Sequence, residues 1–264
     1  MTHATIASVA AEEIAAEIFP LLGTGRQIAP FSGRPGGVTS AVAYRVVALL
    51  QEMRSAQGEK PIGRKIGFTN RTIWAEYGVY APIWGYVTSR SVHDLATSKD
   101  MPLAGLAEPR IEPEIVFGLG RAPAPDMDEA ALLGCIDWIA HGFEIVQSLY
   151  PHWKFTAADS IAANGLHGAL LIGPRHAAKS RAREWLQELS AFDIELDRNG
   201  VFADRGHAAN VLDGPLSALR HLAGLLAHDP DNPPLRAGEI VTTGTLTRAI
   251  PVMPGESWQT RLRP

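Results

Sequence analysis

The stretch RIEPEIVFGLG, residues 110–120, decides the fold because it is an apolar strand that carries two carboxylates. Its isoleucine, valine and phenylalanine residues are typical of a buried β-strand. Side chains two positions apart in a strand project to the same face, so Glu112 and Glu114 would lie side by side. Adjacent buried carboxylates repel each other unless a cation or a shared proton offsets the cost. A divalent cation with oxygen ligands, Mg²⁺ or Mn²⁺, fits this pair, whereas the spacing alone also permits two solvated glutamates on a half-exposed strand.

Two further charged residues stand inside apolar, strand-like segments. Glu144 is the acid in the middle of HGFEIVQS, residues 141–148, and a third inward carboxylate would complete a facial set of three oxygen ligands. Lys65 lies in GRKIG, residues 63–67, where a plain surface role is a poor fit. Near a metal ion its pKa would fall, which would make it a candidate proton carrier. A solvated Glu144 and an exposed strand lysine remain the alternatives.

The rest of the chain after residue 60 predicts an α+β fold. Asn199-Gly200 is a strong signal for a hairpin turn between two strands. Because the predicted strands do not alternate with helices, we expect a curved mixed sheet and not a doubly wound one. The expected helices are residues 70–78, 126–133, 156–163 and 212–228. The expected strands are residues 61–68, 82–89, 109–120, 139–148, 165–173, 192–202, 239–246 and 256–263.

The first 58 residues predict a helical lobe. A helix is expected over residues 5–22, and Thr39 is a plausible N-cap for a second helix. The predicted division is therefore 1–58 for the lobe and 59–264 for a β-rich catalytic domain. The simplest role for the lobe is packing against that domain or against a neighbouring subunit.

Composition and missing motifs exclude several function classes. The 264 residues carry 24 Lys plus Arg against 28 Asp plus Glu, a net charge of −4, so the basic excess typical of nucleic-acid binding is missing. Cys135 is alone, which excludes an intrachain disulfide scaffold. The acidic opening is unlike a signal peptide and no charge-free run of about 18 apolar residues occurs, so we expect a cytoplasmic protein without membrane contact. Motifs for a serine hydrolase elbow, a phosphate loop or a zinc protease are also missing from the sequence.

Several ordered segments together resemble the 2-keto-4-pentenoate hydratase and 4-oxalocrotonate decarboxylase family, within the fumarylacetoacetate hydrolase superfamily. Each segment is weak alone, but their order is specific and runs from residue 63 to about residue 262. The segments are GRKIGFTN (63–70), YGVYAPIWG (77–85), RIEPEIVFGLG (110–120), FEIVQS (143–148), HWKFTAADSIAANG (152–165), VLDGPLSALRHLA (211–223) and GEIVTTGTL (238–246).

The resemblance implies a mixed β-sheet roll of the fumarylacetoacetate hydrolase C-terminal type, with an N-terminal helical lobe and a divalent metal, usually Mg²⁺. It places Glu112, Glu114 and Glu144 at metal-ligand positions and Lys65 at the position of an active-site lysine. It also places two polar residues beside the substrate pocket, Asp159 and Asn164.

The chain departs from the family pattern in two segments near the expected pocket. In residues 78–85, Tyr80 and Ile83 replace the two acids of a G-V-D-x-P-D-F-G segment and Trp84 replaces its phenylalanine, and His167 appears where small hydroxyl residues are usual. No convincing counterpart of the hydrolase branch's His–Glu pair precedes Glu112, which disfavours C–C bond hydrolysis. We expect Tyr80, Trp84, Tyr86, Leu166 and His167 to shape the pocket, with His167 as a candidate general base.

The resemblance implies a hydratase that adds water to a 2-hydroxy-2,4-dienoate, giving a 4-hydroxy-2-oxo acid through a metal-stabilised enolate. Lys65 would transfer the proton of enol–keto tautomerisation. The same enolate forms if CO₂ leaves, so a 4-oxalocrotonate-type decarboxylase is the close alternative. An acylpyruvate-type hydrolase and a non-catalytic partner subunit with the same fold are more distant alternatives. We also expect a homo-oligomer, which could associate with a pathway enzyme.

Overall fold

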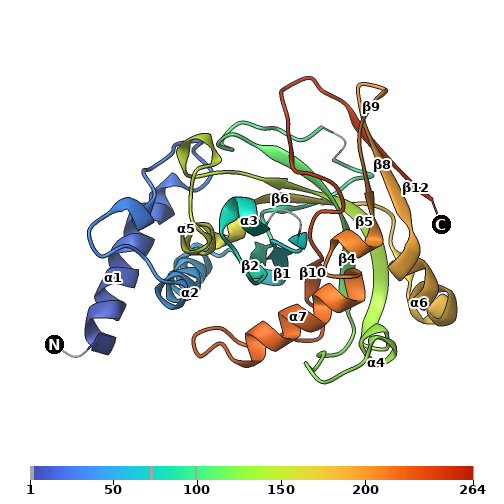
Figure 1. The fold of residues 1–264 in the computed structure, drawn as a ribbon, viewed down its shortest axis with the longest axis horizontal. Helices are drawn as coiled ribbons and strands as arrows, with labels where there is room; N and C mark the ends of the chain where they lie inside the picture. The colour runs from blue at the N-terminus through green and yellow to red at the C-terminus, as the bar shows by residue number, and fades with distance from the viewer. Residues whose placement is uncertain (1–2, 72–73, 99, 264) are drawn as a thin grey trace.

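The fold of the computed structural model is α+β, as predicted, with a curled mixed sheet and helices around it (Figure 1). The structure describes residues 3–71, 74–98 and 100–263. The α-helices are α1 (His3–Ile18), α2 (Ser40–Ala56), α3 (Trp74–Tyr77), α4 (Glu129–Leu133), α5 (Ala157–Ala162), α6 (Ala182–Ala191) and α7 (Pro215–Ala227). Short 3₁₀ turns are interspersed, and one of them, η5 (Asn164–Leu166), lies beside the site.

Most strands belong to one nine-stranded sheet. It runs in the order β2-β1-β10-β4-β5-β6-β3, with β11 paired to β4 and β7 paired to β5. A smaller sheet has the order β12-β8-β9. The strands are β1 (Pro61–Gly67), β2 (Ile83–Thr88), β3 (Val92–Asp94), β4 (Arg110–Leu119), β5 (Ile136–Val146), β6 (His167–Ile172), β7 (His176–Ala177), β8 (Asp193–Arg198), β9 (Val201–His207), β10 (Ile240–Thr242), β11 (Ile250–Pro251) and β12 (Trp258–Arg263).

The large sheet is mixed because two of its pairings are parallel. β1 runs parallel to β10, and β3 runs parallel to β6, while β4, β5 and β6 are antiparallel neighbours. Figure 1 shows α1, α2 and α5 grouped on one side of the sheet, with α6 on the opposite side beside β8 and β12. The long antiparallel pair β4–β5 crosses the middle of the molecule and forms the frame on which the site is built.

Local sequence signals explain several element boundaries. The Thr39 hydroxyl accepts a hydrogen bond from Val42 N and begins α2, as predicted. Thr156 and Asp159 form a capping box at the start of α5. Asn199 and Gly200 both have positive φ, 54° and 76°, which is the geometry of a tight hairpin turn between β8 and β9.

The predicted elements differ from the structure in a few places. The helix expected over residues 70–78 is the short α3, and residues 72–73 lie outside the described residues. The helix α6 was not predicted, although Trp185 and Leu189 stand four positions apart on its buried side. Only Leu189 of α6 is fully buried, so its apolar pattern is short and weak.

One buried cluster links the N-terminal helices to the sheet. Ala15 and Ile18 of α1 and Val46 of α2 lie in the same cluster as Ile66 of β1 and Phe117 of β4. The expected division of the chain at residue 58 therefore stays a prediction. Within the described residues, no helix combines the length and the apolar character that crossing a bilayer requires.

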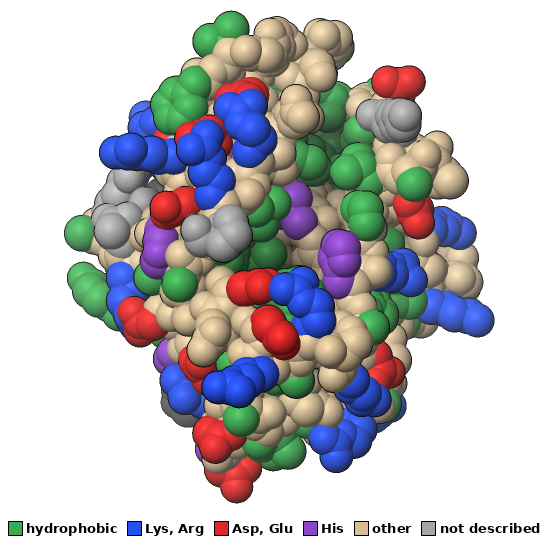
Figure 2. Space-filling model, turned by 90° about the vertical axis from the view of Figure 1, so that its right-hand side faces the viewer, with side chains coloured by type: hydrophobic (Ala, Val, Ile, Leu, Met, Phe, Trp, Pro, Cys, Tyr) green, Lys and Arg blue, Asp and Glu red, His purple; other side chains and the backbone are tan. Residues whose placement is uncertain are grey.

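Figure 2 shows the face seen from the right-hand side of Figure 1. Cationic and anionic side chains are interspersed over it, and a hollow near its middle is bordered by histidine and hydrophobic side chains. The smaller sheet also carries ion pairs, such as Arg261 with Glu195 and Asp197. This face therefore carries charges of both signs.

Candidate active site

Three glutamates converge on one face of the β4–β5 pair. Glu112 of β4 stands directly opposite Glu144 of β5 in the antiparallel register, and Glu114 lies two positions along the same face. One carboxylate oxygen from each lies within 4.8 Å of the other two. Glu114 and Glu144 are fully buried, whereas Glu112 is partly exposed. The structure thus brings together the three acids that the sequence singled out.

The hydrogen bonds of these carboxylates leave charge uncompensated. Glu114 Oε2 accepts a hydrogen bond of 2.9 Å from Gly244 N, but its buried Oε1 receives none from the described residues. Glu144 Oε1 lies 2.7 Å from His167 Nδ1, and its Oε2 lies 3.3 Å from Lys65 Nζ. A buried carboxylate oxygen without a donor is costly and indicates a missing cation or a shared proton.

Burial and mutual repulsion shift the pKa values of the carboxyl groups apart. Burial raises the pKa of Glu112 to about 7, with Lys65 opposing the shift and Glu144 adding to it. Burial and the neighbouring carboxylates raise the pKa of Glu114 well above its ordinary value. Burial also acts to raise the pKa of Glu144, but Lys65 and the His167 hydrogen bond outweigh it, so that pKa falls. The cluster therefore holds a proton at neutral pH that a metal ion would displace.

The donor set fits a hard divalent cation. All three side chains offer carboxylate oxygens, the ligand type that Mg²⁺ and Mn²⁺ prefer. The orphaned Glu114 Oε1 gives the fit a structural basis, because a cation would satisfy it. Glu112, Glu114 and Glu144 could thus hold a metal ion on three of its positions, leaving the others for water or substrate.

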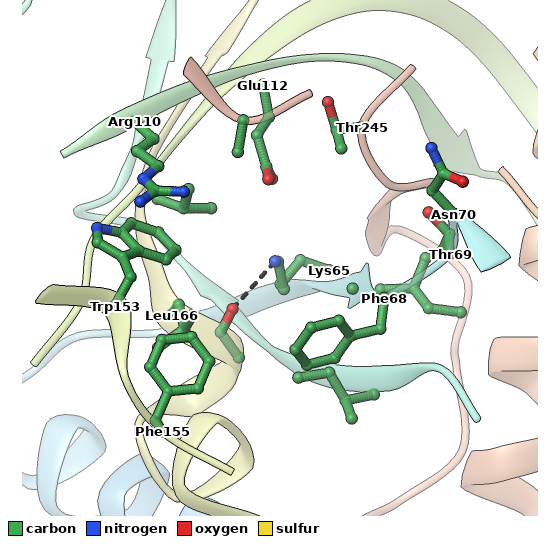
Figure 3. Close-up of a pocket in the computed structure, with 16 residues that line it drawn as sticks. Lys65, Phe68, Thr69, Asn70, Arg110, Glu112, Trp153, Phe155, Leu166 and Thr245 are labelled. Carbon is green, nitrogen blue, oxygen red and sulfur yellow. Dashed lines mark hydrogen bonds between the residues drawn. The ribbon is translucent and has the colours of Figure 1, made fainter. Parts of the chain in front are cut away.

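Lys65 lies buried beside this triad. Its Nζ donates a hydrogen bond of 3.0 Å to Gly165 O and faces Glu144 (Figure 3). Burial lowers the pKa of Lys65, but the three glutamates raise it more, so the net pKa is above its ordinary value. The decrease expected from the sequence supposed a bound metal, whereas the three carboxylates alone act in the opposite direction.

A cavity adjoins Lys65 and Glu112, and its two ends differ in chemistry. Figure 3 shows Arg110 and Trp153 at one end and Thr69, Asn70 and Thr245 at the other. Apolar side chains line the space between them, including Ile83, Val146, Phe68, Phe155 and Leu166. An elongated molecule with an anionic head and an unsaturated carbon chain suits such a lining.

His167 does not line this cavity, contrary to the role of general base expected for it. It is buried behind Glu144, with Nδ1 toward that carboxylate and Nε2 2.8 Å from Ser91 Oγ. Both ring nitrogens are engaged with protein groups, so neither is directed at a substrate. The structure therefore places His167 where it orients Glu144.

Tyr80 and Trp84 are not among the residues that line this cavity, so their expected role in shaping the pocket stays a prediction. Ile83 lines the cavity, and because successive strand residues alternate in direction, Trp84 projects to the opposite face. There the Trp84 ring stacks on Tyr44 at 5.2 Å. The Tyr80 side chain is 84% exposed. Tyr86 packs edge-on against Trp84, also outside the cavity lining.

Asp159 and Asn164 hold the walls in place and do not reach into the cavity. The Asp159 carboxylate accepts hydrogen bonds from Ser32 and from Thr156. The Asn164 side chain accepts from Tyr86 N and donates to Tyr86 O, which fastens η5 to β2. Of the substrate-binding residues expected from the sequence, only Leu166 lines the cavity.

Two lining residues, Arg110 and Trp153, were not predicted from the sequence. The Arg110 guanidinium lies 4.0 Å over the Trp153 ring. A signal for Arg110 was available, because it stands two positions before Glu112 in the same strand and therefore shares its face. For Trp153 no such signal existed, because it follows β5 in an irregular turn with positive φ.

The model for the C-terminal domain of fumarylacetoacetate (FAA) hydrolase matches residues 83–262. A 2-hydroxyhexa-2,4-dienoate hydratase from Comamonas testosteroni is 29% identical over 90% of this chain and 88% of its own length. A 4-oxalocrotonate decarboxylase from a Pseudomonas strain is 31% identical over 83% of this chain and 80% of its own. Among solved structures, a 4-oxalocrotonate decarboxylase from Pseudomonas putida, complexed with magnesium and adipate, superposes with a TM-score of 0.82. It is 25% identical, and the match covers 99% of this chain and 95% of that one.

Proposed function

The chain belongs to the fumarylacetoacetate hydrolase family, and from that premise we propose that it is a metal-dependent hydratase of 2-hydroxy-2,4-dienoates. The reaction adds water to the dienoate and yields a 4-hydroxy-2-oxo acid. The observation that carries the proposal is the convergence of Glu112, Glu114 and Glu144 beside a cavity that also receives Lys65. Hydratases of such dienoates among the relatives support the reaction type.

The three glutamates would hold the cation, for which we propose Mg²⁺, with Mn²⁺ as the alternative. The all-carboxylate donor set supports this choice, and a structural neighbour carries magnesium. When bound, such a cation stabilises the negative charge that develops on the substrate's 2-oxygen during enol–keto tautomerisation.

Lys65 is the residue that we propose to move the proton. Its Nζ is at the cavity wall, held by Gly165 O and Glu144, so its position is fixed before substrate enters. A proton donor held in this way can protonate a substrate carbon as the enol becomes the ketone. The apolar middle of the cavity, with Ile83 and Leu166, would exclude bulk water from the carbon chain.

Water addition needs a polar group near the far end of the conjugated ketone. Thr69, Asn70 and Thr245 form the polar end of the cavity opposite Arg110 and would position that water (Figure 3). His167 has no part in this step, since it does not reach the cavity.

A 4-oxalocrotonate-type decarboxylase is the second candidate. The structural match to such an enzyme extends over nearly the whole chain, and its reaction passes through the same type of enolate. The three acids and Lys65 serve both reactions, so only the products distinguish them.

The test is product identification by NMR with 2-hydroxypenta-2,4-dienoate and with 4-oxalocrotonate, each with and without Mg²⁺. We expect 4-hydroxy-2-oxopentanoate from the first substrate, and no product after EDTA treatment. Glu112→Gln should abolish metal-dependent turnover, whereas Glu184→Gln at an exposed position of α6 is the matched control. Full activity of EDTA-treated protein would refute the metal dependence.

Lys65→Met separates the proton carrier from the metal site. The variant keeps the length of the side chain but has no proton to give, so ketonisation should slow by about 10²–10⁴-fold. Calorimetry should still detect Mg²⁺ binding, because the three carboxylates remain. Unchanged ketonisation would make Lys65 a structural residue.

We further propose that the chain forms a homo-oligomer in the cytoplasm and acts on a small 2-oxo or 2-hydroxydienoic acid. The proposal includes association with an enzyme of the same pathway. The lobe formed by residues 1–58 is the proposed subunit contact. Light scattering of the purified chain tests the oligomer directly.

A further inference from the structure

A chain of buried polar side chains leads from Glu144 to the end of α2. Its first link is His167, whose Nδ1 lies 2.7 Å from Glu144 Oε1 and whose Nε2 lies 2.8 Å from Ser91 Oγ. His167 is 5% exposed and Ser91 is 9% exposed, so water has little access to either contact. The Ser91 hydroxyl is therefore the group that fixes the His167 ring on the side away from Glu144.

Ser91 is itself fixed by the turn that joins β2 to β3. Its backbone N donates to Thr88 O at 3.1 Å, and its hydroxyl oxygen accepts from Thr88 N at 3.3 Å. Its carbonyl oxygen accepts from Leu170 N of β6 at 2.7 Å. The turn and β6 together hold the Ser91 hydroxyl in one place relative to His167, the first residue of β6.

A buried ion pair anchors this turn to the end of α2. The Thr88 hydroxyl donates a hydrogen bond to Glu59 Oε1, and Arg54 Nη1 of α2 donates to the same oxygen at 2.9 Å. Glu59 is 7% exposed and Thr88 is fully buried. A buried carboxylate is costly to keep for packing alone, because an uncharged side chain would fill the same space. The hydrogen-bonded chain that ends on Glu59 gives this carboxylate a second role.

The carboxylates at the two ends of the chain constrain the protons between them. A carboxylate accepts hydrogen bonds and cannot donate them, so the Thr88 hydroxyl proton goes to Glu59, and His167 presents an N–H at Nδ1 to Glu144. Ser91 then gives its own proton either to His167 Nε2 or to Thr88 Oγ1, which lies 3.4 Å from Ser91 Oγ. Either arrangement engages His167 Nε2 through Ser91 and keeps Nδ1–H directed at Glu144.

We propose that Ser91 is a positioning residue of the metal site and that Thr88 and Glu59 hold it in place. Acting through His167, Ser91 keeps the Glu144 carboxylate in the orientation in which it binds a divalent cation. The inference rests on the proposed function, in which Glu144 and two further glutamates hold that cation. It goes beyond that function by making the metal affinity depend on a buried ion pair at the end of α2.

Calorimetric titration with Mg²⁺ tests the role of Ser91 without turnover. Ser91→Ala removes the hydroxyl, so we expect the Kd for Mg²⁺ to rise about threefold to tenfold, less than for a residue that touches a metal ligand itself. Ser217→Ala of α7 is the matched control, since Ser217 is also buried and its hydroxyl accepts from Arg220 at 3.3 Å. A role confined to stability would lower the Tm of both variants and leave both Kd values unchanged, and that result would overturn the proposal.

A double variant tests whether Ser91 acts through His167. Ser91→Ala combined with His167→Gln should bind Mg²⁺ as weakly as His167→Gln alone, because the second substitution has already removed the connection to Glu144. Losses of affinity that multiply would show that Ser91 acts by another route, and would overturn the proposal.

Thr88 allows a rescue experiment on the anchor. Thr88→Val keeps the size of the side chain but cannot donate to Glu59, whereas Thr88→Ser keeps the hydroxyl. We expect the Kd for Mg²⁺ to rise about twofold to fivefold in Thr88→Val and to stay at the wild-type value in Thr88→Ser. Equal Kd values in the two variants would overturn the part assigned to Thr88 and Glu59.

The outcomes separate this inference from the proposed function. If wild type shows these differences in Kd but turns over neither 2-hydroxypenta-2,4-dienoate nor 4-oxalocrotonate, the proposed reaction fails and the positioning role stands. If wild type turns over one of them and Ser91→Ala binds Mg²⁺ as wild type does, the proposed function stands and the positioning role fails. A wild-type protein that binds neither Mg²⁺ nor Mn²⁺ would overturn both.

Discussion

His167 lies between Glu144 and Ser91, with one ring nitrogen turned to each. Such a contact fixes the direction of a carboxylate and keeps it ionised, which matters for a group that would bind a metal. Glu114 receives comparable support from the backbone N–H of Gly244. The orientation of Glu144 and of Glu114 thus depends on a neighbour that does not itself enter the cavity.

His167→Gln should weaken Mg²⁺ binding by about 10–100-fold, because Glu144 loses the donor that orients it. The measurement is calorimetric titration with Mg²⁺, together with kcat at saturating metal. His176→Gln, an exposed histidine of β7, is the control. A general base at His167 would instead lower kcat and leave the metal affinity intact, so that result would contradict the positioning role.

For single residues, the sequence predicted which residues lie near the site better than it predicted where their side chains point. Strand alternation was enough to bring Glu112 and Glu114 to one face. It could not tell that His167 turns away from the cavity, because the partner Ser91 comes from a distant segment of the chain. The sequence also could not show which face of β2 Trp84 occupies. That depends on which face of β2 the helix α2 covers, and α2 is distant along the chain.

The contact between β2 and η5 sets the position of the cavity wall. A Cβ on Gly85 would lie 2.3 Å from the Asn164 carbonyl oxygen, so only glycine permits this approach. Asn164, Gly165 and Leu166 all have positive φ, 57°, 62° and 63°, and this tight turn directs Gly165 O to Lys65. The Asn164 amide compensates for part of the strain by satisfying both backbone groups of Tyr86.

Asn164→Ala should lower the free energy of unfolding by about 1–3 kcal/mol, because the buried N–H and C=O of Tyr86 lose their partners. Urea denaturation measures the loss, and turnover should fall as well, since η5 also carries the carbonyl that holds Lys65. The exposed Gln259→Ala of β12 serves as control. Wild-type stability in Asn164→Ala would show that other contacts fix η5.

The elements themselves were largely predictable where local chemistry is explicit. Thr39, Thr156 and the Asn199-Gly200 turn mark their boundaries in the sequence, and all three occur as predicted or close to it. The helix α6 was missed because most of its surface is exposed and its apolar side is short. Very short strands such as β7 and β11 depend on neighbours far along the chain and leave no pattern of their own.

For the whole molecule, the raised carboxyl pKa values link folding, metal binding and pH. In the metal-free protein the folded state holds protons on Glu112 and Glu114 that the unfolded chain has released. The contribution of Glu112 to stability is therefore lost as pH rises through about 7, and the raised pKa of Glu114 acts in the same direction. A bound metal replaces those protons and therefore stabilises the protein more at high pH.

Mg²⁺ should accordingly raise the Tm more at pH 8 than at pH 6. At pH 6 the metal must displace the proton of Glu112, whereas at pH 8 this carboxyl group is already ionised, since its pKa is about 7. This group alone therefore makes the metal affinity about tenfold lower at pH 6 than at pH 8. His141, whose pKa is lowered to about 4, acts equally with and without metal and cancels in the difference. Thermal melts at both pH values, with a Glu112→Gln, Glu114→Gln double variant as control, check this; an equal Mg²⁺ effect at both would contradict it.

The direct pairing of Glu112 with Glu144 across β4 and β5 also constrains how related sequences can differ. Shifting either strand by one residue turns its acid to the opposite face, whereas the segment between the two strands can change length without moving them. An alignment that opens an odd-numbered gap between Glu112 and Glu114 therefore describes a homologue in which these two acids point to opposite faces of the strand. Such a homologue, however similar elsewhere, should be classed with proteins that share the fold but cannot form the three-carboxylate site.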